Sequence, residues 1–239
     1  MRRRIPVSGG VPAPGRPAHT CLLRLHSFAQ DAMWLGPRPA TVLFLQGCHV
    51  LCPGCMSVET WDDQAGVLVD VADLARWLTG RPSRFLTVSG GEPTEQAPVL
   101  NRLLELLGDD WVVTVYSGHD LDALRADPAP GVSELLERVD VLIAGPYIPQ
   151  RHADLLWRGS SNQVIHDFTG RAPIPPADVS AGVSVRITGS RVVVVGVPPE
   201  PSFLSRMRTE AAKRDVGLVI SDDPRTFPFP TQEPRNVQL

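Results

Sequence analysis

The chain has 239 residues, of which 43% are hydrophobic and 21% charged, a profile typical of a globular protein. The formal net charge is −3, whereas a nucleic-acid-binding domain is usually basic. With only 4 Cys, the chain is not a disulfide miniprotein. Because we find no secretory signal and no run of about 18 apolar residues, we expect a cytoplasmic protein without membrane or nucleic-acid partners.

Residues 1–18 are predicted to form a disordered leader, because Pro and Gly interrupt every periodic segment. A short buried strand is expected at 41–45. A helix should follow at about 70–80, where apolar residues recur at helical spacing before Gly80. The next strand, at 85–88, halts at a pair of glycines.

The alternation of strands and helices continues along the chain. We expect a helix at about 94–107, a strand at about 111–116, helical turns across 119–138 and a strand at 141–143. Strands that alternate with helices favour a parallel sheet with right-handed crossovers, so the predicted fold class is α/β.

The pattern changes after Gly170, where a Pro-rich connection begins. We predict a small ββαβ appendage over 171–222 and a Pro-rich tail over 223–239. The elements expected in the appendage are strands at 184–188 and 191–195, a helix at about 200–214 and a strand at about 216–220.

Three of the four cysteines form the run Cys48-x3-Cys52-x2-Cys55, on a loop directly after the first predicted strand. Clustered cysteines in a reducing compartment more often bind metal or react than form disulfides. A closed zinc site needs four ligands, whereas a [4Fe–4S] cluster held by three thiolates would leave one iron exposed for chemistry. The alternative is a zinc site completed by Cys21, His49 or a distant His.

The residues around this run, Leu45–Gly47 before it and Glu59–Trp61 after it, resemble the radical S-adenosylmethionine (radical SAM) enzymes. Within them, they resemble the activating proteins of anaerobic ribonucleotide reductase. The resemblance implies a [4Fe–4S] cluster on the three cysteines, with SAM chelating the fourth iron. It also implies reductive cleavage of SAM to methionine and a 5′-deoxyadenosyl radical that abstracts hydrogen from a substrate. The implied fold is a partial (β/α) barrel of parallel strands over 19–170.

The segment Ser89-Gly90-Gly91-Glu92-Pro93 follows the second predicted strand. Two glycines let the backbone approach a ligand closely, and a carboxylate beside them can accept hydrogen bonds from an ammonium group. The segment is similar to the family's Gly-Gly-Glu-Pro motif, which implies that the turn binds the amino group of SAM. The alternative is a helix start, with Glu92 as its cap and Pro93 in its first turn.

Tyr116, Ser117 and Gly118 close the third predicted strand at the same sheet edge, where ligands collect in parallel α/β folds. The resemblance implies SAM contacts through Ser117 and nearby backbone; a polar strand-to-helix turn is the alternative. Gly54 stands before the third cysteine, where many relatives have an aromatic residue. An adenine contact at that position would therefore come from the backbone.

Residues 157–163, Trp-Arg-Gly-Ser-Ser-Asn-Gln, resemble a segment of the reductase activases. We expect this segment to shape the SAM pocket, to dock a partner or to do both; the alternative is a hydrogen-bonded turn that supports the barrel. The candidate pocket or substrate residues are Trp157, Arg158, Ser160, Asn162 and Gln163.

Three functions follow from these residues. The first is an activase that abstracts hydrogen from a glycine Cα of a glycyl radical enzyme. The second is a stand-alone radical SAM enzyme that modifies a peptide or small metabolite, and the third is a non-catalytic iron–sulfur or zinc protein. We assign no catalytic role to a side chain, because the cofactor carries the radical chemistry. The expected electron donor is a flavodoxin or ferredoxin.

Overall fold

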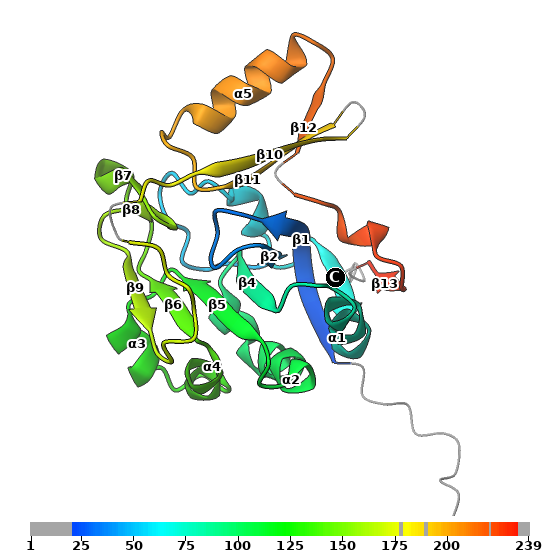
Figure 1. Ribbon diagram of the computed structural model, residues 1–239, viewed down its shortest axis with the longest axis vertical. Coiled ribbons are helices and arrows are strands. Elements are labelled where there is room, and N and C mark those ends of the chain that lie inside the picture. The colour runs from blue at the N-terminus through cyan, green and yellow to red at the C-terminus, as the bar shows by residue number, and fades with distance from the viewer. Residues whose placement is uncertain (1–20, 177–178, 189–190, 220, 234–239) are drawn as a thin grey trace, which may run out of the picture.

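A computed structural model of the protein describes residues 21–176, 179–188, 191–219 and 221–233 (Figure 1). The predicted leader, residues 1–18, lies outside the described residues. The main body of the described chain is built on one large sheet. Its strands are β1 (Leu22–Ala32), β2 (Ala40–Leu45), β3 (Val67–Asp70), β4 (Phe85–Gly90), β5 (Val112–Ser117), β6 (Val141–Ala144), β9 (Val164–Asp167) and β13 (Thr231–Gln232).

These strands form an 8-stranded sheet in the order β13-β3-β1-β2-β4-β5-β6-β9. The four central strands, β2, β4, β5 and β6, run parallel to one another. The outer neighbours β1 and β9 pair antiparallel with β2 and β6. The predicted α/β class with a sheet rich in parallel pairs is therefore confirmed.

Four α-helices cover one face of this sheet (Figure 1). The first of them, α1, is capped by Asp70, whose carboxylate accepts hydrogen bonds from the N–H groups of Ala72 (2.8 Å) and Asp73 (3.3 Å). No helix in the described ranges is long and apolar enough to cross a membrane. The helices are α1 (Val71–Thr79), α2 (Ala97–Leu107), α3 (Leu121–Ala126) and α4 (Val132–Arg138), and the short 3-10 helices are η1 (Val58–Thr60), η2 (Pro93–Gln96), η3 (Pro149–Arg151) and η4 (Pro224–Thr226).

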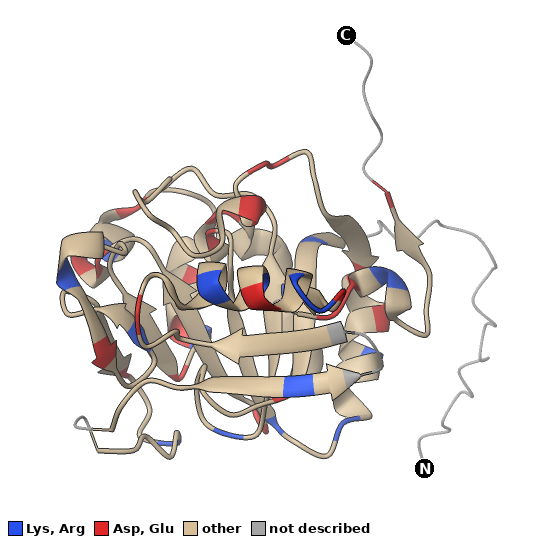
Figure 2. Ribbon diagram, turned by 90° about the horizontal axis from the view of Figure 1, so that it is seen from above, with Lys and Arg blue, Asp and Glu red and all other residues tan. Residues whose placement is uncertain are grey.

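The charged residues of both signs are interspersed along the ribbon (Figure 2). Some pair one turn apart on the helices, such as Arg102 with Glu105 (2.6 Å) and Arg138 with Glu134 (2.7 Å). Exposed pairs of this kind contribute only a few tenths of a kcal/mol each, so packing of the sheet and helices accounts for most of the stability.

Strand β2 is buried on both faces, which explains its uninterrupted apolar run. Leu43 and Leu45 belong to the core between the sheet and helices α1, α2 and α4. Val42 and Phe44 point to the other face and pack against the C-terminal part of the chain. The strand that leads into the cysteine loop is thus held from both sides.

The C-terminal part forms a 3-stranded sheet in the order β10-β11-β12, with α5 beside it (Figure 1). Val193, Val195 and Val197 pack this part of the chain onto β1 and β2. A separate hairpin consists of β7 (His152–Leu155) and β8 (Arg158–Ser160). The C-terminal elements are β10 (Val183–Thr188), β11 (Arg191–Gly196), α5 (Phe203–Ala212) and β12 (Gly217–Val219).

The structure differs from the sequence-based expectation at the end of the main sheet formed by β13, β3 and β1. The sequence did not predict β1 or β3, and part of the expected Pro-rich tail forms η4 and β13. Phe227 is only 7% exposed and stacks on Phe28 with ring centroids 4.4 Å apart. It also meets Trp77 edge-on at 4.8 Å. The surrounding prolines are typical of a loop, but burial of this aromatic side chain stabilises the segment against the core.

We predict that Phe227→Ala lowers the free energy of unfolding by about 3 kcal/mol or more, because it removes a buried ring and leaves a cavity. Urea unfolding under anaerobic conditions measures this loss. Phe168, which is 37% exposed, provides the control. Its replacement by Ala should change stability by about 0.5 kcal/mol or less. Equal losses in the two variants would contradict the packing described here.

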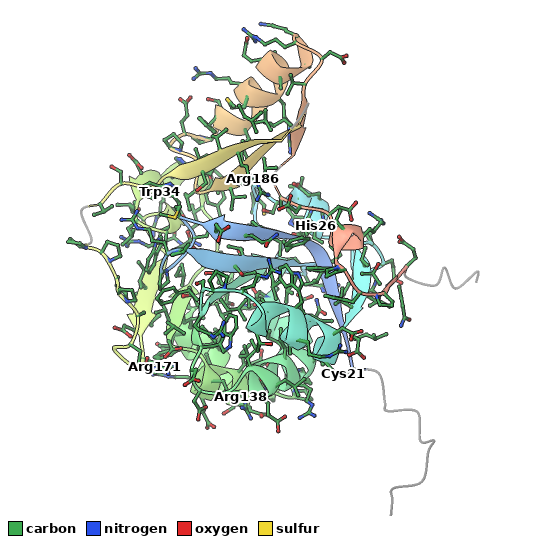
Figure 3. The ribbon with its side chains drawn as sticks, turned by 45° about the vertical axis from the view of Figure 1, so that its right-hand side comes forward. Cys21, His26, Trp34, Arg138, Arg171 and Arg186 are labelled. Atoms are coloured by element: carbon green, nitrogen blue, oxygen red, sulfur yellow. The ribbon has the colours of Figure 1, made fainter. Side chains whose placement is uncertain are left out.

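Asp140, directly before β6, is a buried carboxylate that is only 1% exposed. Its carboxylate accepts hydrogen bonds from the Val113 N–H (2.8 Å), the Thr169 hydroxyl (2.5 Å) and the Arg171 Nε (2.8 Å). Arg171 is labelled in Figure 3. Burial raises the pKa of Asp140, but these hydrogen bonds, with that from Arg171 the strongest, outweigh burial and hold the pKa below its usual value.

This lowered pKa predicts how stability depends on pH. The ionised Asp140 should stabilise the fold fully above its usual pKa of 3.8, and the contribution should disappear as pH falls through the lower folded-state pKa. Asp140→Asn should therefore be less stable than the wild type by about 2 kcal/mol near pH 7. The difference should shrink in strongly acidic solution. A difference that stays constant across this pH range in urea titrations would contradict the prediction.

Candidate cluster and cofactor site

The cysteine loop follows β2 and is closed at its base by two backbone hydrogen bonds. The Gly47 N–H donates to the Thr60 carbonyl (2.8 Å), and the Cys48 N–H donates to the Trp61 carbonyl (3.2 Å). The loop therefore leaves β2 and returns to nearly the same point. Its ends are fixed, although its middle lies near the surface.

Gln46 is a buried residue that sequence analysis assigned no role. Its side-chain amide donates to the carbonyls of Glu59 (3.0 Å) and Asp62 (2.7 Å) on the returning arm of the loop. Its Oε1 lies 2.9 Å from the His26 Nδ1. A polar residue at the end of an apolar strand is the sequence signal that could have identified this brace.

All three cysteines of the loop are partly buried and free of disulfides. The Cys55 N–H donates to the Cys52 carbonyl (3.1 Å), and the Ser57 N–H points at the Cys55 Sγ (3.4 Å). Burial raises the pKa of the Cys48 and Cys55 thiols. A bound cation that takes up thiolates would offset this cost of ionisation.

The donor set fits an iron–sulfur cluster, because cysteine thiolates are the ligands that such clusters use. Among the described residues, no three His, Cys, Asp or Glu side chains gather around one ion position. In a cubane each thiolate binds its own iron, so the three cysteines need not converge on one point. His49, an alternative zinc ligand, has its Nδ1 2.9 Å from the Glu95 carboxylate.

Cys21, the other alternative ligand, lies where the described chain begins, at the start of β1 (Figure 3). Its carbonyl accepts a hydrogen bond from the Val71 N–H (3.0 Å), and its side chain packs against the main core. Cys21 thus has a packing role in the structure.

The glycine turn after β4 lies directly against the cysteine loop. The Glu92 N–H donates to the Gly47 carbonyl (2.9 Å), and the Gly91 N–H donates to the Leu45 carbonyl (2.8 Å). A Cβ added at Gly91 would stand 2.1 Å from the Gly47 oxygen. Gly91 is required because no side chain fits at this contact.

The Glu92 carboxylate is 1% exposed and joins the glycine turn to the end of β5. It accepts hydrogen bonds from the N–H (3.1 Å) and hydroxyl (2.7 Å) of Thr94 and the hydroxyl of Ser117 (3.0 Å). The Gly118 N–H donates to its other oxygen (2.8 Å). The helix start that we considered as an alternative is present, because Glu92 caps η2 and Pro93 occupies its first turn.

Glu95 and Gln96, directly after the motif, are further braces that the sequence analysis missed. Glu95 accepts a hydrogen bond from the His49 N–H (2.7 Å). The Gln96 amide donates to the carbonyls of Arg24 and Gln46, both at 3.0 Å, and its oxygen accepts from the Arg24 N–H (2.8 Å). The two side chains hold the cysteine loop and the edge of β1 to η2.

Tyr116 joins β5 to the polar segment 157–163, because its hydroxyl donates to the Trp157 carbonyl (2.9 Å). Burial raises the pKa of the Tyr116 phenol, which therefore stays protonated as a donor. Trp157 is 2% exposed and has a left-handed backbone with φ of +56°. The strained backbone turns its indole inward while its carbonyl meets the tyrosine.

The polar segment uses most of its side chains to hold its own shape. The Gln163 oxygen accepts from the Gly159 N–H (2.8 Å), and its amide donates to the Gly145 carbonyl (3.1 Å). The Asn162 amide donates to the Pro146 carbonyl (2.7 Å). The hydrogen-bonded turn that we considered as an alternative is therefore present.

The other two polar candidates of this segment behave similarly. The Ser160 hydroxyl accepts a hydrogen bond from the Ile148 N–H (3.2 Å). The Arg158 guanidinium approaches the carbonyls of Leu156 and Gln163, both at 3.4 Å. Each contact ties β8 to nearby backbone.

A cavity of about 130 Å³ brings four of the predicted site residues together. Ser89, Tyr116, Trp157 and Gln163 line it, together with residues that follow the third cysteine. None of the three cysteines of the loop lines it. The other predicted site residues outside the lining are Gly54, Gly90, Gly91, Glu92, Pro93, Ser117, Gly118, Arg158, Ser160 and Asn162. Its full lining is Leu35, Phe44, Met56, Ser57, Ser89, Tyr116, Tyr147, Trp157, Gly159, Gln163, Gly196, Val197, Pro198 and Leu204.

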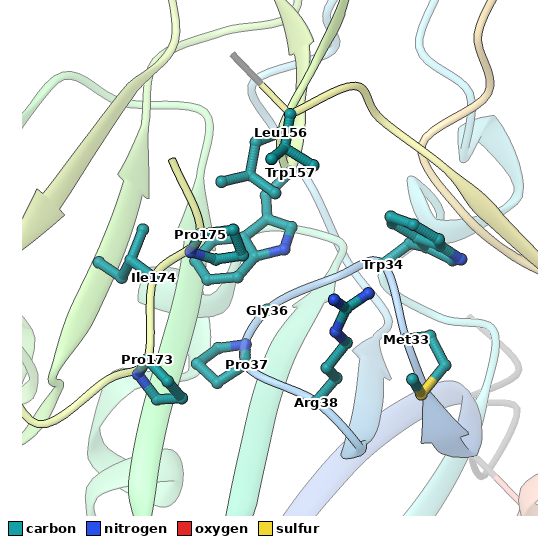
Figure 4. Close-up of a pocket in the computed structure, with 11 residues that line it drawn as sticks. Met33, Trp34, Gly36, Pro37, Arg38, Leu156, Trp157, Pro173, Ile174 and Pro175 are labelled. Atoms are coloured by element: carbon teal, nitrogen blue, oxygen red, sulfur yellow. The ribbon is translucent and has the colours of Figure 1, made fainter. Parts of the chain in front are cut away.

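Trp157 also lines a larger cavity of about 420 Å³, between Pro173–Pro175 and the connection from β1 to β2 (Figure 4). Arg38 is the one charged residue of that lining, and its guanidinium lies 5.3 Å from the centre of the Trp34 ring. No predicted cysteine or glycine-turn residue lines it. Despite its size, this cavity is separate from the chemistry of the cysteine loop.

Three thiols on a loop after a parallel strand, held against a glycine turn, define an iron–sulfur enzyme of the radical SAM class, with a [4Fe–4S] cluster and SAM as cofactors. A family model described as a 4Fe-4S single cluster domain matches residues 35–166. The chain belongs to this family, more than half of its length being matched.

Curated relatives carry the name anaerobic ribonucleoside-triphosphate reductase-activating protein. The one from Vibrio cholerae is 34% identical over 155 residues, which cover 56% of this chain and 91% of the relative. The one from Haemophilus influenzae is 36% identical, covering 53% and 86%. The one from Escherichia coli K12 is 29% identical, covering 55% and 90%.

Among solved structures, QueE from Escherichia coli overlaps part of this chain. The TM-score is 0.35 at 18% identity, and the overlap covers 50% of this chain and 69% of QueE.

We predict that Gly91→Ala disrupts the site, because the added methyl group would collide with the Gly47 carbonyl. The iron content of anaerobically reconstituted protein should fall by at least about half, and stability should fall by about 2 kcal/mol. Gly80 provides the control, since a Cβ there would lie an ordinary 3.4 Å from its nearest neighbour. Full iron content in Gly91→Ala would show that the turn and the loop are not coupled.

Proposed function

We propose that the protein is a radical SAM activase that generates a glycyl radical in a partner enzyme of the anaerobic ribonucleotide reductase type. The observation that carries the proposal is the hydrogen-bonded contact between the cysteine loop and the glycine turn, beside a cavity at one edge of the sheet. The names of the relatives support the same activity.

When bound, the cluster would supply the electron for reductive cleavage of SAM, and SAM would supply the radical chemistry for hydrogen abstraction from the glycine Cα. Cys48, Cys52 and Cys55 would hold the cluster. Their loop is closed by Gln46 and by the Gly47 and Cys48 N–H groups, so the three thiols are presented from a fixed frame.

The residues that would bind SAM come from the ends of β4 and β5. The half-buried turn of Ser89, Gly90 and Gly91 would bind the amino group through its backbone, and Tyr116 lines the neighbouring cavity together with Ser89. Because the Glu92 carboxylate is buried and already accepts four hydrogen bonds, we assign it the role of positioning Ser117 and Gly118.

Other parts of the proposal concern the surroundings of the site. Gly54 is exposed and has φ of +72°, and a Cβ there would lie 2.9 Å from Pro149, so a side chain would not fit and any adenine contact here would come from the backbone. Trp157 and Gln163 would shape the pocket, while Arg158, Ser160 and Asn162 keep the segment in place.

We further propose that residues 19–170 form the radical SAM core as a partial barrel, which 171–222 extend as an appendage. A barrel needs a curved sheet. Register shifts occur where β1 pairs with β2, and such irregularities bend a strand, which supports the proposed barrel. A flavodoxin or ferredoxin would supply the electron, in a cytoplasmic setting that keeps the thiols reduced.

A second candidate function is a stand-alone radical SAM enzyme that modifies a peptide or small metabolite. The part of the chain that follows the matched family region favours this candidate. Residues 196–198 and Leu204 belong to that part and line the cavity. Electron paramagnetic resonance separates the two candidates. The activase predicts a glycyl radical in a partner reductase, whereas the alternative predicts none.

We predict that Cys52→Ala abolishes the cluster, because loss of one thiolate removes the protein ligand of one iron. Iron analysis and the release of 5′-deoxyadenosine from SAM and a strong reductant measure the result. The matched control is Cys21→Ala, which should keep about four irons per chain, the content of one [4Fe–4S] cluster. A full cluster in Cys52→Ala would contradict the prediction and implicate Cys21 or a His as the ligand instead.

A further inference from the structure

Strand β10 is the outer strand of the C-terminal sheet, whose order is β10-β11-β12. It pairs with β11, from Val183 opposite Gly196 to Thr188 opposite Arg191. Within the described ranges, no other segment forms backbone hydrogen bonds with its outer side. A strand of this kind presents a row of unpaired N–H and C=O groups to any further strand that can pair with it.

The hydrogen bonds between β10 and β11 show which backbone groups face outward. The Val197 N–H donates to the Gly182 carbonyl (3.0 Å), so this carbonyl points toward β11. Backbone groups alternate in direction along an antiparallel strand. The N–H and C=O groups of Val183, Val185 and Ile187 therefore point away from β11, to the open edge of the sheet.

The side chains of the same three residues form an apolar strip on one face of the sheet. Val185 lies opposite Val194 of β11, on the face turned away from the main body. Helix α5 lies on this face and packs against β12 (Figure 1). It leaves the strip open, because Val185 is 52% exposed and Ile187 is 73% exposed.

The other edges of the two large sheets are protected in ways that β10 is not. Strand β13 has 2 residues, β12 has 3, and β9 carries His166 and Asp167. Short strands and charged side chains are the usual protection of a sheet edge. Strand β10 has 6 residues, and its one charged side chain, Arg186, turns to the opposite face and pairs with Asp222. An apolar edge of this length calls for a partner strand.

The pattern of β10 matches a second copy of β10. An antiparallel pair with a two-fold axis at Val185 places each Val185 opposite its copy and Val183 opposite Ile187. These are the outward-facing residues, and each opposed pair exchanges two backbone hydrogen bonds. Ser184 then lies opposite Arg186. An axis at Arg186 would instead place two guanidinium groups directly opposite each other, which is destabilising.

We propose that the protein forms a homodimer through β10, in which the two C-terminal sheets join into one continuous sheet around a two-fold axis at Val185. The three apolar side chains of each copy contact those of the other across the seam, between the two α5 helices. A two-fold interface uses the same patch on both subunits, and the outward-facing residues of β10 are symmetric about Val185 as this requires. The inference does not depend on the proposed function.

Sedimentation velocity of the full-length, cluster-containing protein under anaerobic conditions tests the dimer. A single pair of strands makes a small interface, so we expect a dissociation constant on the order of 10 μM. The protein should sediment as a monomer near about 1 μM and mostly as a dimer near about 200 μM. A monomer at both concentrations would overturn the proposal. Assemblies that grow without limit would also overturn it, because a two-fold interface closes at the dimer.

Val185→Lys places two ammonium groups opposite each other at the axis. The dissociation constant should rise at least about 100-fold, which corresponds to about 2.8 kcal/mol. The matched control is Val164→Lys, at a valine that is 48% exposed on the edge strand β9, and it should dimerise as the wild type does. Circular dichroism and iron content report whether each variant is folded. An unchanged dimer in Val185→Lys, or a dimer lost only in Val164→Lys, would contradict the proposed interface.

A charge pair tests the register and keeps the dimer testable if Val185→Lys fails to fold. Ile187→Lys should weaken the dimer, because the apolar strip loses a side chain and gains a charge. Adding Val183→Glu to the same chain places a carboxylate opposite each new ammonium group. The double variant should dimerise at least about tenfold more tightly than Ile187→Lys alone, a gain of about 1.4 kcal/mol. Absence of this recovery would overturn the register around Val185.

Val185→Pro separates pairing of the strands from packing of their exposed faces. It removes the outward N–H of β10, keeps an apolar side chain and leaves the hydrogen bonds to β11 in place. Loss of the dimer in this variant, with the circular dichroism spectrum of the wild type, supports strand pairing. A dimer of wild-type strength would show that the two copies meet in another way.

Discussion

The site depends on one backbone contact, the hydrogen bond from the Glu92 N–H to the Gly47 carbonyl. It joins the turn after β4 to the first residue of the cysteine loop, and Gly91 allows the two backbones to approach. Gln46 and Gln96 extend the same junction to the far arm of the loop and to β1. Two segments about 45 residues apart in sequence are thus held in one geometry.

The buried Glu92 carboxylate carries this geometry one strand further. It accepts hydrogen bonds from the Ser117 hydroxyl and the Gly118 N–H, so the ends of β4 and β5 are joined to the cysteine loop. Hydrogen bonds to a buried charge are strong, and an unpaired carboxylate here would be costly. Glu92 therefore belongs to the frame that positions the site.

The sequence predicted the central strands and helices because they are local, strongly patterned elements, such as the apolar run of β2. It missed β1 and β13, whose pairing partners are distant in sequence and whose polar residues weaken any periodic signal. The cysteine run and the glycine motif indicated the candidate site. Gln46 could not be assigned, since its role arises from contacts that only the folded chain creates.

The aromatic cluster of Phe28, Trp77 and Phe227 has a consequence for synthesis of the protein. Strand β13 is the last described element, yet it pairs with β3, and Phe227 fills a hollow beside β1. During translation, β1 and α1 emerge from the ribosome long before this ring. The ring that covers Phe28 comes about 200 residues later in the sequence, so this part of the sheet can form only after the elements between them have been synthesised.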